Sequence, residues 1–412
     1  MNLIFVFIIF STCFLATARR RQDDDDAADI NIEDVYSTED DPPFPSRFIS
    51  QKGDLRKLFA LAAAINNQDN NMVCSPVSAL LPLGKLAIGA KHQALNQLLS
   101  AIGVSRKRKL KSHFKKLIED LKYIHGVQLD MASRIYLSKY SNLHRKFLDR
   151  SKYIFDSTAE KIDFDNPVDA AYLINTWVSK KTNGMIKDLI SPSAISPSAS
   201  LILVNAIYFA GQWKEPFDKV ETGTFYTPSG EKQVDMMSKL AWYNYANSNV
   251  LGAQLIEVPY AGDGASFVIL LPNKRNGLPA LLSQLKLAPD LLDWELSRMK
   301  KTKIMLMMPK FKMETQLDLI NLYKKIGLYN IFNSRYTGLE KIVRGQSVFV
   351  SSAVQKAVIE VTELGTEAAA AGAIQIETLH LFLPEKFEAN HPFLFYIVTQ
   401  RQQLFVGTLV NP

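Results

Sequence analysis

The sequence predicts an α+β fold, and the order of its apolar patterns is the main reason. Segments with apolar residues at helical spacing are concentrated in the first third of the chain, and strand-like apolar runs follow later. Grouped helices and strands are typical of α+β proteins, whereas a doubly wound parallel sheet alternates them. The chain has 412 residues, of which 47% are hydrophobic and 22% charged, so it can bury a large core.

Four segments are expected to be helices because apolar residues recur in them every three to four positions. They are residues 53–66, 76–90, 92–101 and 106–124. In the last of them Ser105 is a plausible N-cap, and one helix face would collect Leu110, Phe114, Leu117, Leu121 and Ile124.

Four apolar runs are expected to be strands, at residues 201–209, 266–272, 303–311 and 394–399. The first, LILVNAIYF, is uninterrupted, which suits a strand buried on both faces, although a buried helix fits the same run.

The N-terminal part divides into two segments that precede the folded domain. Residues 1–18 combine an apolar run with a small-residue cleavage site, Ala16-Thr17-Ala18, and predict a signal peptide. Residues 19–45 contain three arginines and ten acidic residues but few large apolar groups, so we expect a disordered acidic tail. No linker-like stretch follows, and we expect a single domain at 46–412. The protein is therefore expected to be secreted and extracellular, without a membrane anchor.

Chemistry-bearing motifs are scarce in this chain. Of its two cysteines, Cys13 would leave with the signal peptide, and Cys74 lies in an apolar run that favours a buried thiol. There is no GxSxG, HExxH, CxxC, Walker or GxGxxG motif, and the six histidines show no metal-ligand spacing. A triad assembled from distant residues stays open. We expect no enzyme activity, no cofactor and no metal.

Five segments, in order, resemble the serpin family. They are NMVCSPVSALLPLGKLAIGA (71–90), INTWVSKKTNGMIKDLI (174–190), LVNAIYFAGQWKEPF (203–217), ELGTEAAAA (363–371) and FEANHPFLFYI (387–397). Together they extend the resemblance from about residue 48 to the end of the chain. The resemblance implies a serpin fold with three β-sheets, eight or nine helices, and an exposed reactive loop between Glu363 and Phe387.

The segment that would form the reactive loop is unusually small and uncharged. On local propensity alone, TEAAAA would begin a helix capped by Thr366. The resemblance implies another role, because serpin loops insert into a central sheet after cleavage. The implied hinge consists of Glu363, Gly365, Thr366, Glu367, Ala368, Ala369, Ala370 and Ala371.

An inserted strand alternates its side chains between two faces, and this sequence suits that requirement. One set, which can face inward, contains no charge: Thr366, Ala368, Ala370, Gly372, Ile374, Ile376 and Thr378. The charged Glu367 and Glu377 both belong to the other set.

The family spacing, fifteen residues counted from Gly365 inclusive, places the bait residue at Leu379 and the reactive bond between Leu379 and His380. If the loop length differs, Leu381 or Phe382 would be the bait residue instead. All three are large and apolar, so the implied targets are chymotrypsin-, cathepsin-G- or elastase-like proteases.

The resemblance also assigns residues that would control insertion. The positions of the shutter, which lies beneath the central sheet, and of the breach, where the loop would enter, map to Ser75, Ser78, Asn205, Trp213, Lys310 and Gln355. At Gln355 the family usually has histidine, which leaves the geometry of the shutter in question. Lys310 and Glu363 would form an ion pair near the point of insertion.

A basic segment at 105–126 offers a candidate polyanion site. Its cationic residues are Arg106, Lys107, Arg108, Lys109, Lys111, Lys115, Lys116 and Lys122. In serpins this segment corresponds to a helix that binds heparin-like glycosaminoglycans in some members. An ordinary solvated basic face explains the same pattern. Nucleic acid would match the charge, but secretion argues against it.

The expected function is irreversible inhibition of an extracellular serine protease through a covalent complex, by a monomer. A non-inhibitory serpin, such as a carrier or storage protein, is the alternative, and a secreted hydrolase is disfavoured by the missing motifs.

Overall fold

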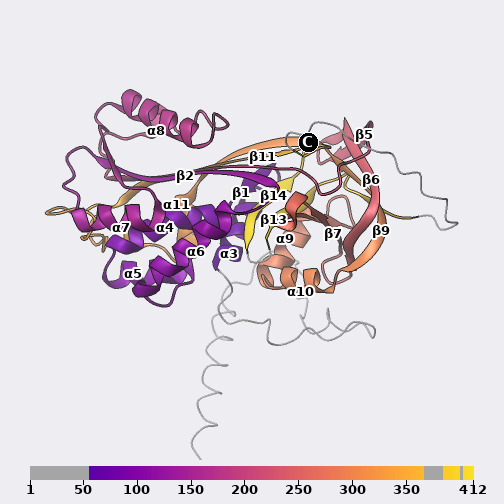
Figure 1. The fold of residues 1–412 in the computed structure, drawn as a ribbon, viewed down its shortest axis with the longest axis horizontal. Coiled ribbons are helices and arrows are strands. Elements are labelled where there is room, and N and C mark those ends of the chain that lie inside the picture. Colours follow the sequence, from indigo (N-terminus) through magenta and orange to yellow (C-terminus); the bar gives the residue numbers. More distant parts are fainter. Residues whose placement is uncertain (1–54, 366–383, 400–401) are drawn as a thin grey trace, which may run out of the picture. The chain divides into compact units, whose positions relative to one another are not determined.

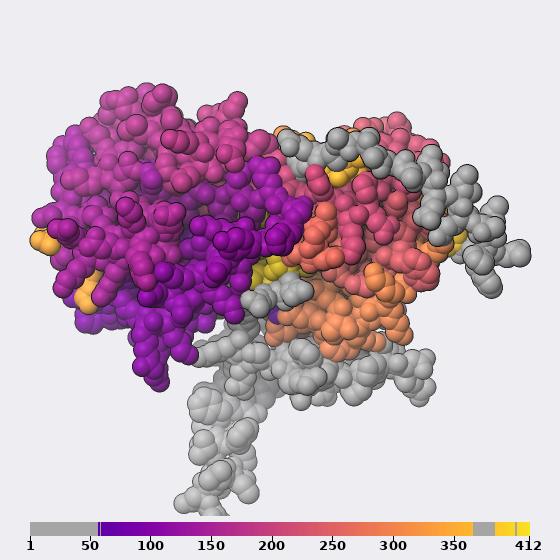
Figure 2. All heavy atoms as spheres, in the orientation of Figure 1, coloured from indigo at the N-terminus to yellow at the C-terminus, as the bar shows by residue number. Residues whose placement is uncertain are grey.

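The computed structural model describes residues 55–365, 384–399 and 402–412. Contacts divide the chain into two units, Met1–Pro45 and Ser46–Pro412, and all the described residues belong to the second. Figure 2 shows one face of this unit, on which residues before about 200 gather on one side and residues of about 220–310 on the other.

The described residues form nine α-helices (Figure 1). They are α3 (Leu55–Asn66), α4 (Pro76–Gly89), α5 (His92–Ile102), α6 (Leu110–Lys122), α7 (Arg145–Phe155), α8 (Pro167–Lys181), α9 (Leu278–Leu287), α10 (Leu291–Arg298) and α11 (Leu319–Lys325).

A five-stranded sheet lies at the centre, in the order β10-β11-β4-β2-β3. Its strands are β10 (Phe311–Asp318), β11 (Val350–Val361), β4 (Leu201–Gly211), β2 (Val127–Ser138) and β3 (Glu160–Ile162). Every residue of β4 is buried, as the uninterrupted run predicted. In Figure 1, α8 lies on one face of this sheet, and α4, α6 and α7 lie on the other.

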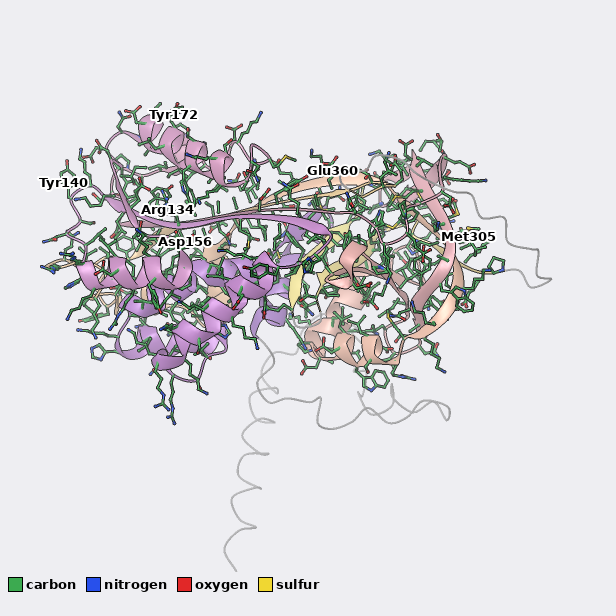
Figure 3. All side chains as sticks on the ribbon, in the orientation of Figure 1. Arg134, Tyr140, Asp156, Tyr172, Met305 and Glu360 are labelled. Atoms are coloured by element: carbon green, nitrogen blue, oxygen red, sulfur yellow. The ribbon has the colours of Figure 1, made fainter. Side chains whose placement is uncertain are left out.

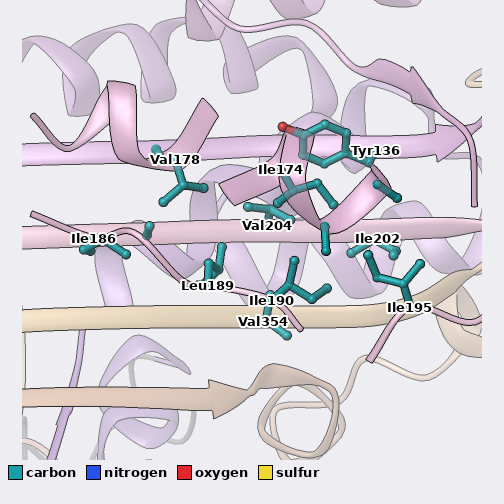
Figure 4. Packing of buried hydrophobic residues seen from close by; sticks show 14 of the residues in the cluster. Tyr136, Ile174, Val178, Ile186, Leu189, Ile190, Ile195, Ile202, Val204 and Val354 are labelled. Atoms are coloured by element: carbon teal, nitrogen blue, oxygen red, sulfur yellow. The ribbon is translucent and has the colours of Figure 1, made fainter. Parts of the chain in front are cut away.

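Apolar side chains attach α8 to the sheet (Figure 4). Ile174 and Val178 of α8 belong to one buried cluster with Ile202 and Val204 of β4 and Val354 of β11. Because β4 alternates its side chains, its odd-numbered residues are left to face the opposite side, towards α4.

The second sheet has nine strands, in the order β1-β14-β13-β8-β7-β6-β9-β12, with β5 paired to β6. They are β1 (Met72–Cys74), β5 (Lys219–Thr227), β6 (Gly230–Ser248), β7 (Ala253–Pro259), β8 (Ser266–Pro272), β9 (Lys300–Pro309), β12 (Glu385–Glu388), β13 (Phe393–Val398) and β14 (Gln403–Leu409).

Where three sheets were expected, the described strands thus form two. The reason is the length of β6, which has 19 residues. Its first part pairs with β5 and β9, and its last five residues pair with β7. One strand therefore joins two groups of strands into a continuous hydrogen-bonded sheet.

Most of the expected elements are confirmed, but one strand end and one helix start were wrong. The strand expected at 303–311 ends at Pro309 as β9, and Phe311 already begins β10. The segment expected at 106–124 begins with a 3₁₀ turn at Lys107–Lys109, and its α-helix spans Leu110–Lys122. Lys107 donates from Nζ to the Ala90 carbonyl at 2.8 Å, an attachment that the periodicity could not reveal. Ser105 therefore caps no helix. The apolar face is as expected from Leu110 to Leu121, but Ile124 lies beyond the helix and is half-buried.

Candidate functional site

The central sheet is closed between β4 and β11. These strands pair in parallel from Val350↔Leu201 to Ile359↔Phe209, and Gln355 lies opposite Asn205. A further strand can enter between them only after this ladder of backbone hydrogen bonds separates.

A buried polar cluster lies under the middle of this ladder. It contains Ser75, Ser78, Asn205 and Gln355, and all four are fully buried. The two serines start α4, because Ser75 is the N-cap whose Oγ accepts from the Ser78 amide at 3.2 Å. Pro76 follows at the first helical position, where its fixed φ favours a helix start.

Gln355 joins β11 to this helix start with three hydrogen bonds. Its Nε2 donates to the Ser75 carbonyl and to Ser78 Oγ, both at 3.0 Å. Its Oε1 accepts from the Ser75 amide at 3.0 Å. A glutamine amide supplies two donors and an acceptor, so the side chain uses both of its ends here.

Asn205 completes the cluster from β4. Its Nδ2 donates to Ser78 Oγ at 3.1 Å, so one serine hydroxyl accepts from both β4 and β11. Asn205 Oδ1 is buried without a hydrogen-bond partner in the described part of the chain. Separation of the two strands would break these hydrogen bonds to Ser78. Each polar group left buried without a partner would cost about 1–3 kcal/mol.

Trp213 lies two residues after the C-terminal end of β4, close to the start of the expected hinge. It is almost fully buried and donates from Nε1 to the Thr362 carbonyl at 2.7 Å. Its ring stacks on Tyr260 with a centroid distance of 4.6 Å and an interplanar angle of 7°. The tryptophan therefore attaches the end of β11 to the segment that follows β7.

Lys310 and Glu363 form the expected ion pair, with Nζ 2.7 Å from Oε2. Each side chain is 30% exposed, so screening by solvent limits the contribution of this ion pair to the stability of the fold. The hydrogen bond from Lys310 lowers the pKa of the Glu363 carboxyl. The Glu363 carbonyl also accepts from the Phe217 amide at 2.9 Å.

Gly365, itself a residue of the expected hinge, is the last described residue before Thr366. Its φ is +81°, and it forms an isolated antiparallel bridge with Gln212. A Cβ there would lie 2.2 Å from the Gly211 carbonyl oxygen. Both the left-handed backbone and the close approach require glycine.

The basic segment forms an exposed surface on α6 and the turn before it. Seven of its eight expected cations are exposed, and the eighth, Lys107, is half-buried. Burial, followed by repulsion from Lys341, Arg150 and Lys91, lowers the pKa of Lys107 to about 8. Lys111 and Lys115 lie 4.6 and 3.7 Å from the ring centroid of Tyr153 on α7, and hydrogen bonds from both lower the pKa of its phenol.

This basic surface continues on α7, which the sequence reasoning missed. Four further exposed cations lie on this helix: Arg145, Lys146, Arg150 and Lys152. The missed signal was the RKFLDRSK segment, whose apolar residues at helical spacing leave the cations on the outer face.

Several expected site residues lie outside the described ranges. They are the hinge residues Thr366, Glu367, Ala368, Ala369, Ala370 and Ala371 and the reactive-bond residues Leu379 and His380. The expected signal peptide (1–18) and acidic tail (19–45) also lie outside them.

A sequence profile described as "Serpin (serine protease inhibitor)" matches residues 57–412. The chain belongs to the serpin family. The expectation that it is no enzyme agrees with this membership, because serpins are protease inhibitors.

The serpin's relatives include two proteins from Bombyx mori. "Antichymotrypsin-2" is 38% identical over 347 residues, covering 83% of this chain and 92% of the relative. "Antitrypsin" is 36% identical, covering 84% and 89%. Among solved structures, native protease nexin-1 with heparin matches with a TM-score of 0.78 and 27% identity, covering 90% and 100%. The serpin fold is thereby confirmed, and this serpin is related to inhibitory insect serpins.

Sequence reasoning missed the most deeply buried lysine among the described residues of this serpin. Lys85 is 1% exposed, in the middle of α4. Its Nζ contacts the Ser133 carbonyl and, at 3.0 Å, Ser157 Oγ. A lysine within the otherwise apolar PVSALLPLGKLAIG segment was the available signal.

No group of three His, Cys, Asp or Glu residues in the described ranges could hold a metal ion. No helix in the same ranges is both long and apolar enough to cross a bilayer.

Proposed function

We propose that this serpin is a secreted, irreversible inhibitor of serine proteases, acting by insertion of its cleaved reactive loop between β4 and β11. One observation carries the proposal: β4 and β11 pair directly, and Gly365 bridges to Gln212 just beyond the end of β4. The residues that follow Gly365 therefore start next to the ladder that insertion would open.

The proposed reaction begins as ordinary proteolysis. The serine Oγ of the protease attacks the Leu379 carbonyl carbon, the bond to His380 breaks, and the new amine leaves protonated with residues 380–412. An ester then joins Leu379 to the protease. Insertion of residues 366–378 as a strand carries the protease away before water can hydrolyse that ester.

Two features of the chain support insertion rather than simple cleavage. The inward set of the loop contains no charged residue, so no unpaired charge would enter the sheet. The residues at the opening are held by interactions that can separate: the partly exposed Lys310–Glu363 ion pair and the side-chain hydrogen bonds to Ser78. Non-inhibitory carriers have no need of such a loop.

The identity of the bait residue supports the target class. Leu379 is large and apolar, which fits the specificity pocket of chymotrypsin- or elastase-like enzymes. The similarity to both an antichymotrypsin and an antitrypsin does not choose between targets.

The test is covalent trapping. The purified protein is incubated with chymotrypsin, elastase and trypsin and analysed by SDS gel and mass spectrometry. We expect an SDS-resistant complex with a chymotrypsin- or elastase-like enzyme and a released peptide that starts at His380. Cleavage without any complex would make the protein a substrate or a carrier instead.

Secretion is tested separately. We expect the protein recovered from the medium of expressing cells to begin at Arg19, by N-terminal sequencing. Retention in the cells with residues 1–18 intact would contradict it.

We further propose that the basic surface on α6 and α7 binds a heparin-like glycosaminoglycan. The exposed cations of both helices support this, as does the structural similarity to protease nexin-1, a protein solved with heparin. We expect Lys111→Glu/Lys116→Glu to lower the salt concentration of elution from a heparin column, because a surface with fewer cations releases fewer counterions on binding. The matched control is Lys300→Glu/Lys301→Glu, a change of two exposed lysines on β9. Equal effects of the two variants would make the binding a matter of net charge alone.

A further inference from the structure

The outward face of β6, β9 and β12 carries an exposed tryptophan. Trp242 is 60% exposed, whereas Trp213 and Trp294 are almost fully buried and Trp177 is partly buried. A tryptophan side chain offers a large apolar area together with a polar N–H group, and tryptophan is enriched at protein interfaces.

The strand register places other apolar groups beside it. In β6, Leu240 and Trp242 are exposed while Ala241 and Tyr243 are buried, so the first two share the outward face. Leu240 pairs with Met305 of β9, and Met305 pairs with Lys386 of β12. Met305 is half-buried and is labelled in Figure 3. We call the outward residues Leu240, Trp242, Lys301, Lys303, Met305 and Lys386 the β6–β9–β12 face.

The rim of this face is positively charged. Lys303 lies opposite Trp242 and Lys301 lies opposite Asn244, both on β9. Lys386 continues the row of Leu240 and Met305, and its nearest carboxylate, Glu388, is 3.9 Å away. An apolar centre with a cationic rim fits a partner surface with apolar side chains surrounded by carboxylates.

The position of the face in the chain puts it within reach of a protease bound at the reactive bond. Lys386 is seven residues from Leu379, so the two are separated by at most about 25 Å of extended chain. A protease domain of about 230 residues has a radius of gyration of about 17 Å. A standard interface covers about 800 Å² on each partner, a disc of about 16 Å radius. A protease bound to the reactive bond is therefore large enough to reach this face.

We propose that the β6–β9–β12 face is a second docking surface for the body of the protease engaged at the reactive loop. This inference rests on the proposed inhibitory function and goes beyond it, because it assigns part of the target recognition to a surface outside the loop. Trp242 is the central contact, since tryptophan is enriched among residues that dominate binding energy.

The experiment separates the rate of association from the outcome of trapping. Second-order inhibition rates and stoichiometries are measured for the full chain against chymotrypsin, pancreatic elastase and cathepsin G. For the enzyme inhibited fastest, we expect Trp242→Ala to slow association five- to tenfold and to leave the stoichiometry unchanged. Trp242→Phe retains an aromatic contact and should keep most of the rate. Lys301→Glu should slow association at low salt and less at high salt.

The matched control is Tyr172→Ala on α8, an exposed aromatic residue 69% accessible and outside this face. Melting temperatures check that every variant is folded. A Trp242→Ala rate within twofold of wild type for all three enzymes would overturn the docking surface while leaving the inhibitor proposal intact. A raised stoichiometry with an unchanged rate would place Trp242 in loop insertion instead, which also overturns it.

Two further results would also overturn the docking surface. If the wild-type protein traps none of the enzymes, the inhibitory function fails first and the docking surface fails with it. A concentration-dependent dimer in sedimentation that Trp242→Ala abolishes would assign the face to a second copy of the chain and overturn the proposal.

Discussion

Lys85 is a buried cation held by neutral groups. Its ammonium contacts the Ser133 carbonyl and the Ser157 hydroxyl, and it lies 5.6 Å from the ring centroid of Phe155. No carboxylate forms a salt bridge with it in the described ranges. Burial, followed by repulsion from Arg134, lowers its pKa to about 7. Because Ser133 pairs with Asn205, the cation holds β2 directly beside the shutter cluster.

The lowered pKa of Lys85 predicts a dependence of stability on pH. Between about pH 7 and pH 10.5 the unfolded chain binds a proton at this residue and the native chain does not. The free energy of unfolding should therefore rise with pH across that window, by on the order of a few kcal/mol. Lys85→Met should remove this rise and stabilise the protein at pH 7, measured by urea unfolding at several pH values.

The change should leave no polar group unpaired, because Ser157 Oγ also donates to the Ser133 carbonyl at 3.0 Å. The control is Lys286→Met, a substitution at an exposed position in the last turn of α9. An equal pH slope in Lys85→Met and wild type would show that the lysine remains protonated in the fold.

A second prediction concerns the expected bait residue, Leu379. Leu379→Arg should move inhibition from chymotrypsin-like to trypsin-like enzymes, because an acidic specificity pocket pairs with a guanidinium. The measurement is the ratio of the two inhibition rates, which we expect to change by at least a hundredfold. An unchanged ratio would place the bait at Leu381 or Phe382.

At the scale of elements, the shutter cluster depends on a glutamine where serpins usually have histidine. Gln355→Leu would remove three hydrogen bonds and leave the Ser75 amide without this acceptor. We expect a loss of about 1–3 kcal/mol in the free energy of unfolding. Gln316→Leu, an exposed glutamine on β10, is the control and should change it by less than about 0.5 kcal/mol. If Gln355→Leu lowers the free energy of unfolding no more than Gln316→Leu does, water replaces the hydrogen bonds that Gln355 makes in the cluster.

The hinge makes a prediction about the inserted strand. Thr366→Arg would place an unpaired charge on its inward face, at a cost of several kcal/mol. The variant should be cleaved as a substrate, with a raised stoichiometry of inhibition, while its native fold is unchanged. Glu367→Arg, on the outward set, is the matched control. The facing of the strand is wrong if both variants trap protease equally well.

Periodicity predicted the helices and buried strands because burial on one or both faces determines where apolar residues fall. The uninterrupted LILVNAIYF run became β4, buried on both faces. Shutter contacts across 280 residues, such as Gln355 to Ser75, came only from family resemblance, since nothing local connects them. The joining of two strand groups by β6 and the attachment of Lys107 to Ala90 depend on tertiary contacts that no local pattern encodes.

For the whole domain, the closed ladder between β4 and β11 implies a sheet that can gain a strand. After cleavage, residues 366–378 could pair with both neighbours and bury Ile374 and Ile376. Two isoleucines contribute about 1.5–3 kcal/mol each on burial, and each new hydrogen bond contributes about 1 kcal/mol. Even after the entropy of ordering the loop, the cleaved protein should be more stable than the intact one.

Cleavage in the loop should therefore raise the melting temperature, by more than about 10 °C for a gain on the order of 10 kcal/mol. The cut is made with thermolysin, a zinc protease that uses metal-activated water and forms no acyl-enzyme, so insertion is separated from trapping. Mass spectrometry locates the cut within 366–383, and calorimetry compares intact and cut protein. Thr366→Arg cut at the same bond should melt close to its intact form, because the charge prevents entry of the strand. If cut wild-type protein melts no higher than intact protein, β4 and β11 do not admit the loop, and inhibition by insertion is excluded.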